Sequence, residues 1–195
     1  MSLPRSFWLL FLLGIALRCV ALNQPLVDAH LLRQCQTAAA TKSMLAEPGF
    51  PLSARIPWQG DLVTRFILEL PLYNYLVIGT HHLTGHLDLS GKLTSILLWA
   101  GSFLCLQFIW RRMLDERQTL WANGMFVIAP LSVFYGQAFM PEMLIQALAF
   151  GLILTTLFTT KVPPLRDGRQ LLRSASPDCW SSCRKSAIST LSSPS

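Results

Sequence analysis

The stretch PLVDAHLLRQCQTA (residues 25–38) follows the first apolar segment of the chain directly. It is the first place where an acid, Asp28, is soon followed by an imidazole and a guanidinium. Two later acids, Glu69 and Glu142, occur in similar settings at the edges of apolar segments. We therefore expect the apolar segments to bring these three acids to one face of a membrane.

The composition of the whole chain favours a membrane protein. Of its 195 residues, 52% are hydrophobic and only 13% are charged, whereas a soluble domain carries about 25% charged residues. The net charge is +6. Because the basic residues stand between apolar runs, and not in clusters interleaved with aromatic residues, we expect a lipid bilayer and no nucleic acid as partner.

Four apolar segments predict transmembrane helices and hence an all-α, polytopic fold. They are residues 7–22, 93–110, 120–138 and 143–160. The first is slightly shorter than the roughly 20 residues that a spanning helix needs. Arg18, near its end, is expected to snorkel to the membrane interface and extend it. A cleaved signal peptide is the alternative for this segment.

Residues 23–92 are expected to form a large external loop between the 1–22 anchor and the three spans of residues 93–162. Within the loop, residues 28–41 show helical spacing with two stripes. The apolar stripe consists of Leu31, Leu32, Cys35, Ala38 and Ala39, and the polar stripe of His30, Arg33, Gln34, Thr37 and Thr41. The two stripes predict an amphipathic helix.

Two further segments of this loop have distinct patterns. Pro and Gly residues over residues 48–60 predict an irregular loop. Residues 66–83 are apolar but are interrupted by polar residues, and their tyrosines and histidines are typical of a membrane interface. This pattern predicts a juxtamembrane helix lying at the surface.

The distribution of positive charge predicts the orientation. Residues 111–117, RRMLDER, follow the second apolar segment, and the positive-inside rule places them in the cytoplasm. The N-terminus is then cytoplasmic too, and the three acids share the external face. If residues 66–83 crossed the membrane, either the basic loop or the N-terminus would lie on the wrong side.

Residues 163–195 differ from everything before them. They are rich in Ser and Arg and have no apolar periodicity, so they cannot bury enough surface to fold alone. A disordered cytoplasmic tail, the end of a fragment, and a shift of reading frame after about residue 160 all agree with this abrupt change.

Four charged residues are candidates for chemistry. Asp28 is either a helix N-cap or a general base at the membrane surface. Glu69 stands in an apolar setting, where a carboxylate is costly unless it is paired or functional. Glu142 either compensates the dipole of a helix that restarts at Pro141 or joins the other acids in holding a divalent cation. Arg33 either binds a phosphate or belongs to a solvated face.

The order of these motifs resembles a known family. DAHLLRQ (residues 28–34) is followed by ELPLYNY (69–75), the basic pair of residues 111–112, and QAFMPE (137–142). Over residues 5–160 the chain resembles the N-terminal third of the polytopic GT-C glycosyltransferases. The closest branch is glycosyltransferase family 39, which includes the dolichyl-phosphate-mannose-protein mannosyltransferases and the aminoarabinose transferases of lipid A.

The resemblance implies an inverting transfer of a sugar from a polyprenyl-phosphate donor to an external protein or glycolipid acceptor. It assigns Asp28 as the base or acceptor-positioning residue, Glu142 as its companion, and Glu69 to acceptor or metal binding. Arg33, or a divalent cation, would stabilise the departing phosphate. We expect the setting to be a bacterial inner membrane.

The chain also departs from the family. Its members have several hundred residues and many more spans, and later helices build part of their donor groove. The chain as given would then be a truncated or inactive copy. A non-catalytic membrane accessory or scaffold protein is the main alternative. A transporter fragment is disfavoured, because transporters place polar groups near mid-membrane whereas these acids stand at segment edges.

Overall fold

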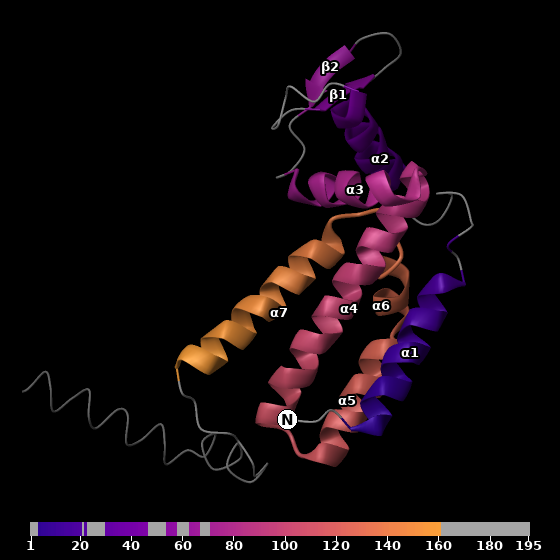
Figure 1. Ribbon diagram of the computed structural model, residues 1–195. Coiled ribbons are helices and arrows are strands. Elements are labelled where there is room, and N and C mark those ends of the chain that lie inside the picture. The colour runs from indigo at the N-terminus through magenta and orange to yellow at the C-terminus, as the bar shows by residue number, and fades with distance from the viewer. Residues whose placement is uncertain are drawn as a thin grey trace, which may run out of the picture.

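The computed structural model describes residues 4–20, 22, 30–46, 54–57, 63–66 and 71–160. The chain in this part is mainly helical (Figure 1). Its elements, in chain order, are α1 (Arg5–Cys19), α2 (Leu31–Ala46), β1 (Ala54–Pro57), β2 (Val63–Phe66), α3 (Leu72–Thr84), α4 (Leu87–Met113), α5 (Glu116–Ile128), α6 (Pro130–Tyr135) and α7 (Glu142–Thr159).

The helices form two parts, which we name the bundle and the cap. The bundle consists of α1, α4, α5 and α7, which run alongside one another, with α6 continuing α5 (Figure 1). The cap consists of α2 and α3 at one end of the bundle, with α3 lying across that end. The start of α1 and the turn between α4 and α5 lie at the opposite end.

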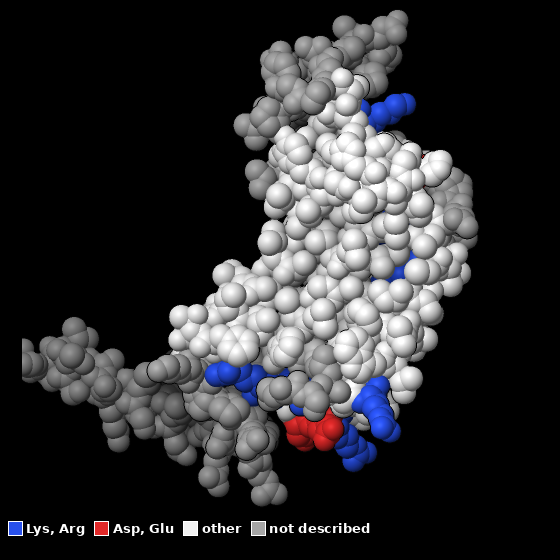
Figure 2. Space-filling model, viewed as in Figure 1, with Lys and Arg blue, Asp and Glu red and all other residues white. Residues whose placement is uncertain are grey.

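Two of the four predicted spans are helices long and apolar enough to cross a membrane. These are α4 and α7. In α4 half of the most apolar stretch is buried, whereas in α7 only 11% of it is buried. An apolar helix in the core of a soluble protein would be mostly covered, so the bare apolar face of α7 fits contact with lipid. Figure 2 shows charged residues mainly near the ends of the molecule on this face, with a largely uncharged surface between them.

The prediction of one continuous helix over residues 120–138 is wrong. The helix ends at Ile128, and α6 starts at Pro130 after a break at Ala129, whose φ and ψ are −55° and 126°. Proline lacks a backbone N–H and excludes its predecessor from the helical region, so the break follows from the sequence itself. α4 also starts earlier than predicted, at Leu87.

The prediction of an irregular loop over residues 48–60 is wrong in part. β1 and β2 form a small antiparallel hairpin in which Ala54 lies opposite Phe66 and Pro57 opposite Val63. Pro57 occupies the end of its strand, where the missing N–H does least harm to the ladder.

The core of the bundle is a stack of aromatic rings between α1, α4 and α5. Phe7, Trp99 and Phe103 are almost completely buried. The rings of Trp99 and Phe103 are nearly parallel, with their centroids 5.4 Å apart, and Phe103 stacks in turn on Phe7. Gly14 of α1 lets the helices approach closely, because a Cβ there would overlap the Trp99 ring.

Arg18 does not snorkel to the membrane interface as predicted. Its side chain is fully buried, with the guanidinium carbon 3.6 Å from the centroid of a Trp99 ring. Its two terminal nitrogens donate to the carbonyl oxygen of Gly14 at 2.9 Å and to Ser132 Oγ at 2.8 Å. The cation turns inward because the bundle offers it a ring face and two acceptors that the lipid does not.

The buried face of α2 is its polar stripe. Gln34, Thr37 and Thr41 of the polar stripe are buried, whereas Leu32 of the apolar stripe is 78% exposed. The polar face packs against α3, where Asn74 Nδ2 donates to Thr41 Oγ1 at 3.0 Å. The hydrogen bonds compensate for burying polar groups, so polarity alone does not show which side of α2 faces outward.

Candidate functional site

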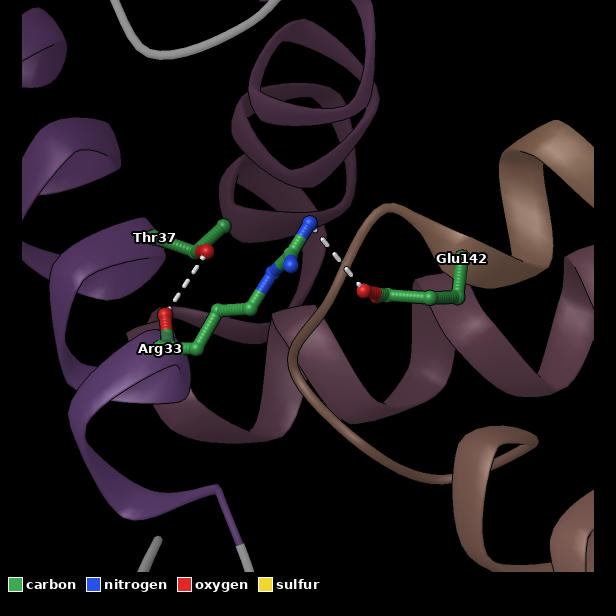
Figure 3. A network of polar contacts seen from close by, with 3 residues as sticks. All are labelled: Arg33, Thr37 and Glu142. Atoms are coloured by element: carbon green, nitrogen blue, oxygen red, sulfur yellow. Dashed lines mark hydrogen bonds and ion pairs between the residues drawn. The ribbon is translucent and has the colours of Figure 1, made fainter.

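Two of the four predicted site residues come together at the cap end of the bundle. Arg33 Nη2 lies 3.2 Å from Glu142 Oε1, although the two residues are far apart in the sequence (Figure 3). Asp28 and Glu69 lie outside the described residues. The structure therefore joins one charged residue from the opening stretch with one from the Pro-Glu step before α7.

The first turn of α2 positions Arg33. The chain enters this helix through His30, which has a positive φ of 68°, and the backbone N–H of Arg33 donates to the carbonyl oxygen of His30 at 3.0 Å. Thr37 Oγ1 donates to the carbonyl oxygen of Arg33 at 2.9 Å (Figure 3). With its backbone fixed in this way, the half-exposed Arg33 side chain points toward α7.

Glu142 is the first residue of α7 and follows Pro141. Pro141 ends the preceding turn and starts a helix without needing a backbone donor. The negative side chain therefore stands at the positive end of the helix dipole. Glu142 Oε2 is buried and has no hydrogen-bond partner among the described residues. A buried acceptor without a partner costs free energy, so this oxygen is available to a ligand that enters the site.

Gln34 was recognised in the sequence only as part of the polar stripe, yet it secures the site. Its side chain is 1% exposed, and its Oε1 accepts a hydrogen bond from the backbone N–H of Phe139 at 3.3 Å. This contact ties α2 to the turn that leads into Glu142. Its position one residue after Arg33 in a helix-forming stretch gave no signal for a contact this distant in sequence.

Tyr73 is the second residue that the sequence did not reveal, because its predicted place was the membrane interface. The structure buries it to 1% exposure where α3 of the cap meets α4 of the bundle. Its hydroxyl lies 2.9 Å from Ser95 Oγ and 3.1 Å from the carbonyl oxygen of Gly91, and Ser95 Oγ donates to the carbonyl oxygen of Ala138. Burial raises the pKa of the Tyr73 phenol above its ordinary value, and the negative charge of Glu142 raises it further.

The described part of the chain contains no group of three or more His, Cys, Asp or Glu residues arranged to hold a metal ion. His82 and His86, four residues apart, do not belong to one helix. α3 ends at Thr84, and Gly85 follows with a φ of 71°, so His86 instead precedes the first turn of α4. A divalent cation held by Glu69 together with Asp28 stays a prediction.

The site thus combines a half-exposed guanidinium with a partly buried carboxylate at the end of an apolar bundle. The guanidinium is suited to a phosphate, and the carboxylate is suited to a hydroxyl or a second cation. Comparison of the chain with known proteins gives no further guide to its chemistry: no family model matches it, and no curated protein or solved structure shows significant similarity.

Proposed function

We propose that the chain is part of a membrane glycosyltransferase of the GT-C type, which moves a sugar from a polyprenyl-phosphate donor to an acceptor outside the membrane. The observation that carries the proposal is the ion pair between Arg33 and Glu142. It brings together two motifs whose order along the sequence resembles glycosyltransferase family 39. A charged pair at the rim of an apolar bundle is where the phosphate of a membrane lipid would meet a polar acceptor.

The proposed topology has four membrane crossings, with the cap outside and the N-terminus in the cytoplasm of a bacterial inner membrane. Helices α4 and α7 supply two crossings, and α1 and the α5–α6 pair supply the others. α1 has 15 residues and so extends about 22 Å. Arg111 and Arg112, in the last turn of α4, support this orientation through the positive-inside rule.

In the proposed reaction, the acceptor hydroxyl oxygen attacks the anomeric carbon of the sugar while the bond from that carbon to the phosphate oxygen breaks. The configuration inverts, and the hydroxyl proton passes to the carboxylate of Asp28. Because a lipid phosphate is already a good leaving group, a base for the acceptor is needed more than an acid. Arg33 stabilises the departing phosphate, and Glu142 holds Arg33 in place until the phosphate takes over its charge.

The test is transfer by the purified full chain in liposomes. The donors are radiolabelled polyprenyl-phosphate mannose and polyprenyl-phosphate aminoarabinose, and the readout is the release of polyprenyl phosphate. We expect Asp28→Asn to lower the rate by about 100-fold or more, as for the loss of a general base. Arg33→Ala should lower it by about 100-fold, as for the loss of a charge-stabilising donor. Glu116→Gln, at the exposed start of α5, is the matched control and should leave the rate unchanged.

The accessory-protein alternative predicts a different outcome from the same variants. The Arg33–Glu142 pair also joins α2 to α7, so it has a structural use without any chemistry. If no donor is turned over above the rate of empty liposomes, while Glu142→Gln loosens the cap in hydrogen exchange, the non-catalytic function is the correct one.

A further inference from the structure

We propose that a zwitterionic phospholipid with a primary ammonium group, such as phosphatidylethanolamine, binds in a groove between α2 and the α3–α4 turn. The groove has a volume of 880 Å³, which lies within the range of about 300–1,000 Å³ typical of small-molecule sites. Its walls come from α2, α3, the start of α4, and Leu22 just beyond α1.

The groove has an apolar part that fits hydrocarbon. Leu22, Ala38, Leu45 and Leu87 are among the residues that line it. It lies where the cap meets the apolar bundle. An occupant with a polar head and an apolar tail would cover both kinds of wall, which a soluble ion or sugar would not.

The polar part of the groove carries one positive and one negative side chain that do not form an ion pair with each other. Lys42 and Asp88 both line it and both are exposed. Across the described part of the chain, neither side chain forms an ion pair. Because their formal charges cancel, the groove does not favour a lipid with net negative charge. Two separated charges instead match a headgroup that holds a phosphate and an ammonium group on one short linker.

The groove offers several suitable partners for the phosphate. His81 and His86 line the groove together with Lys42, and imidazole N–H and ammonium groups both donate to phosphate oxygens. Leu87 and Leu89 of the first turn of α4 line the same wall, and His86 provides no side-chain cap for this helix. Asp88 is then left as the acceptor for the ammonium group.

This groove is separate from the Arg33–Glu142 site. Lys42 follows Arg33 by nine positions, which at about 100° per residue places it roughly half a turn away around α2. The inference rests on the membrane setting of the proposed function but does not depend on sugar transfer. Failure of the transfer assay therefore leaves it standing, and failure of the lipid assay leaves the transferase standing.

The experiment is native mass spectrometry of the full chain released from nanodiscs. The nanodiscs contain equal amounts of phosphatidylethanolamine, phosphatidylcholine and phosphatidylglycerol. Phosphatidylcholine differs from phosphatidylethanolamine in its methylated nitrogen, which cannot donate hydrogen bonds, and phosphatidylglycerol has no nitrogen. We expect phosphatidylethanolamine to be retained about three- to fivefold over both, the effect of one exposed ion pair. Equal retention of the three lipids would overturn the proposal.

Two variants assign the contacts. Asp88→Asn should abolish the preference for phosphatidylethanolamine over phosphatidylcholine while lipid is still bound, and Lys42→Met should lower the retention of both. Glu116→Gln and Arg117→Ala, which make the same kinds of charge change at the opposite end, should change neither. An unchanged preference in Asp88→Asn, with folding verified by thermal unfolding, would contradict the proposal. Displacement of the bound lipid by soluble phosphoethanolamine at equal concentration would contradict the assignment to a lipid.

Discussion

The bundle and the cap differ in the side chains through which their helices meet. In the bundle, aromatic rings such as Trp99 and Phe103 fill the interior, while α7 exposes Leu148 and Leu152. In the cap, α2 buries Gln34 and Thr41 and exposes Leu32. The difference shows that in this chain an apolar stripe does not by itself mark the buried side of a helix. Polar contacts also mark the side on which helices meet, as they do between helices in lipid.

The interior of the bundle follows the same rule in a milder form. Asn123 Nδ2 donates to Gln107 Oε1 at 2.6 Å between α5 and α4. Ser132 Oγ accepts hydrogen bonds from both Arg18 Nη2 and Trp99 Nε1. The aromatic stack supplies most of the packing area, whereas these polar groups specify which helix lies next to which.

The largest effect should come from the aromatic centre of the bundle. We expect Trp99→Ala to lower the free energy of unfolding by about 4 kcal/mol, because it opens a large cavity and removes the ring beneath Arg18. Unfolding by sodium dodecyl sulphate in mixed micelles measures this. Trp121→Ala is the matched control, because Trp121 is 67% exposed, and it should cost less than about 1 kcal/mol. Equal losses would mean that the bundle is not packed around Trp99.

The next largest effect should come from Arg18, where two variants distinguish the contribution of its charge from that of its volume. Arg18→Ala should cost about 3 kcal/mol in the same assay, because it leaves a cavity and removes the stacking on Trp99. Arg18→Met keeps most of the volume and avoids the cost of burying a cation, so it should cost less than half as much. If both variants lose the same free energy, the positive charge itself is required, and the view that Arg18 acts mainly through packing is wrong.

In the cap, replacing a polar residue of α2 should cost more stability than replacing an apolar one. Thr41→Val should lower the free energy of unfolding by about 1.5 kcal/mol, because Asn74 loses its shorter acceptor inside the cap. Leu32→Ser, on the exposed side of the same helix, should change it by less than about 0.5 kcal/mol. A larger loss of unfolding free energy in Leu32→Ser than in Thr41→Val would mean that α2 packs through its apolar stripe.

The smallest effect should be a pH dependence arising from Tyr73. Its pKa is raised in the folded chain, so the unfolded chain loses this proton first, near its ordinary pKa of 10.0. The contribution of Tyr73 is therefore fully present below pH 10 and is lost as the pH rises through and above 10, by at most about 1.4 kcal/mol per pH unit. Tyr73→Phe should remove this part of the decline, as measured by unfolding at pH 9 and pH 11. Parallel curves for the two proteins would contradict it.

Much of the fold is predictable from local sequence. The apolar runs located α1, α4 and α7, and Pro141 marked the start of α7. Pro130 also indicates the break after α5, but the apolar run on both sides of it predicts a continuous helix. The short hairpin of β1 and β2 was missed because the Pro and Gly residues around it indicate turns more strongly than strands.

The candidate site was predictable only in its charged members. Arg33 and Glu142 were visible because charge is rare in this chain. Their contact was not, since it depends on how α2 docks on the turn before α7. Gln34 and Tyr73 were missed because uncharged polar residues near a membrane usually lie at its surface, and only tertiary packing shows that these two are buried.

The burial of Arg18 also has a consequence for how the chain is made. The hydroxyl that receives its guanidinium belongs to Ser132, 114 residues later in the chain. At about 5–20 residues per second, a ribosome needs roughly 6 to 20 seconds to add that length. During this interval α1 is already synthesised but carries an arginine without its final partners. The contacts of Arg18 with Trp99 and Ser132 can therefore form only after α4 and α6 have been synthesised.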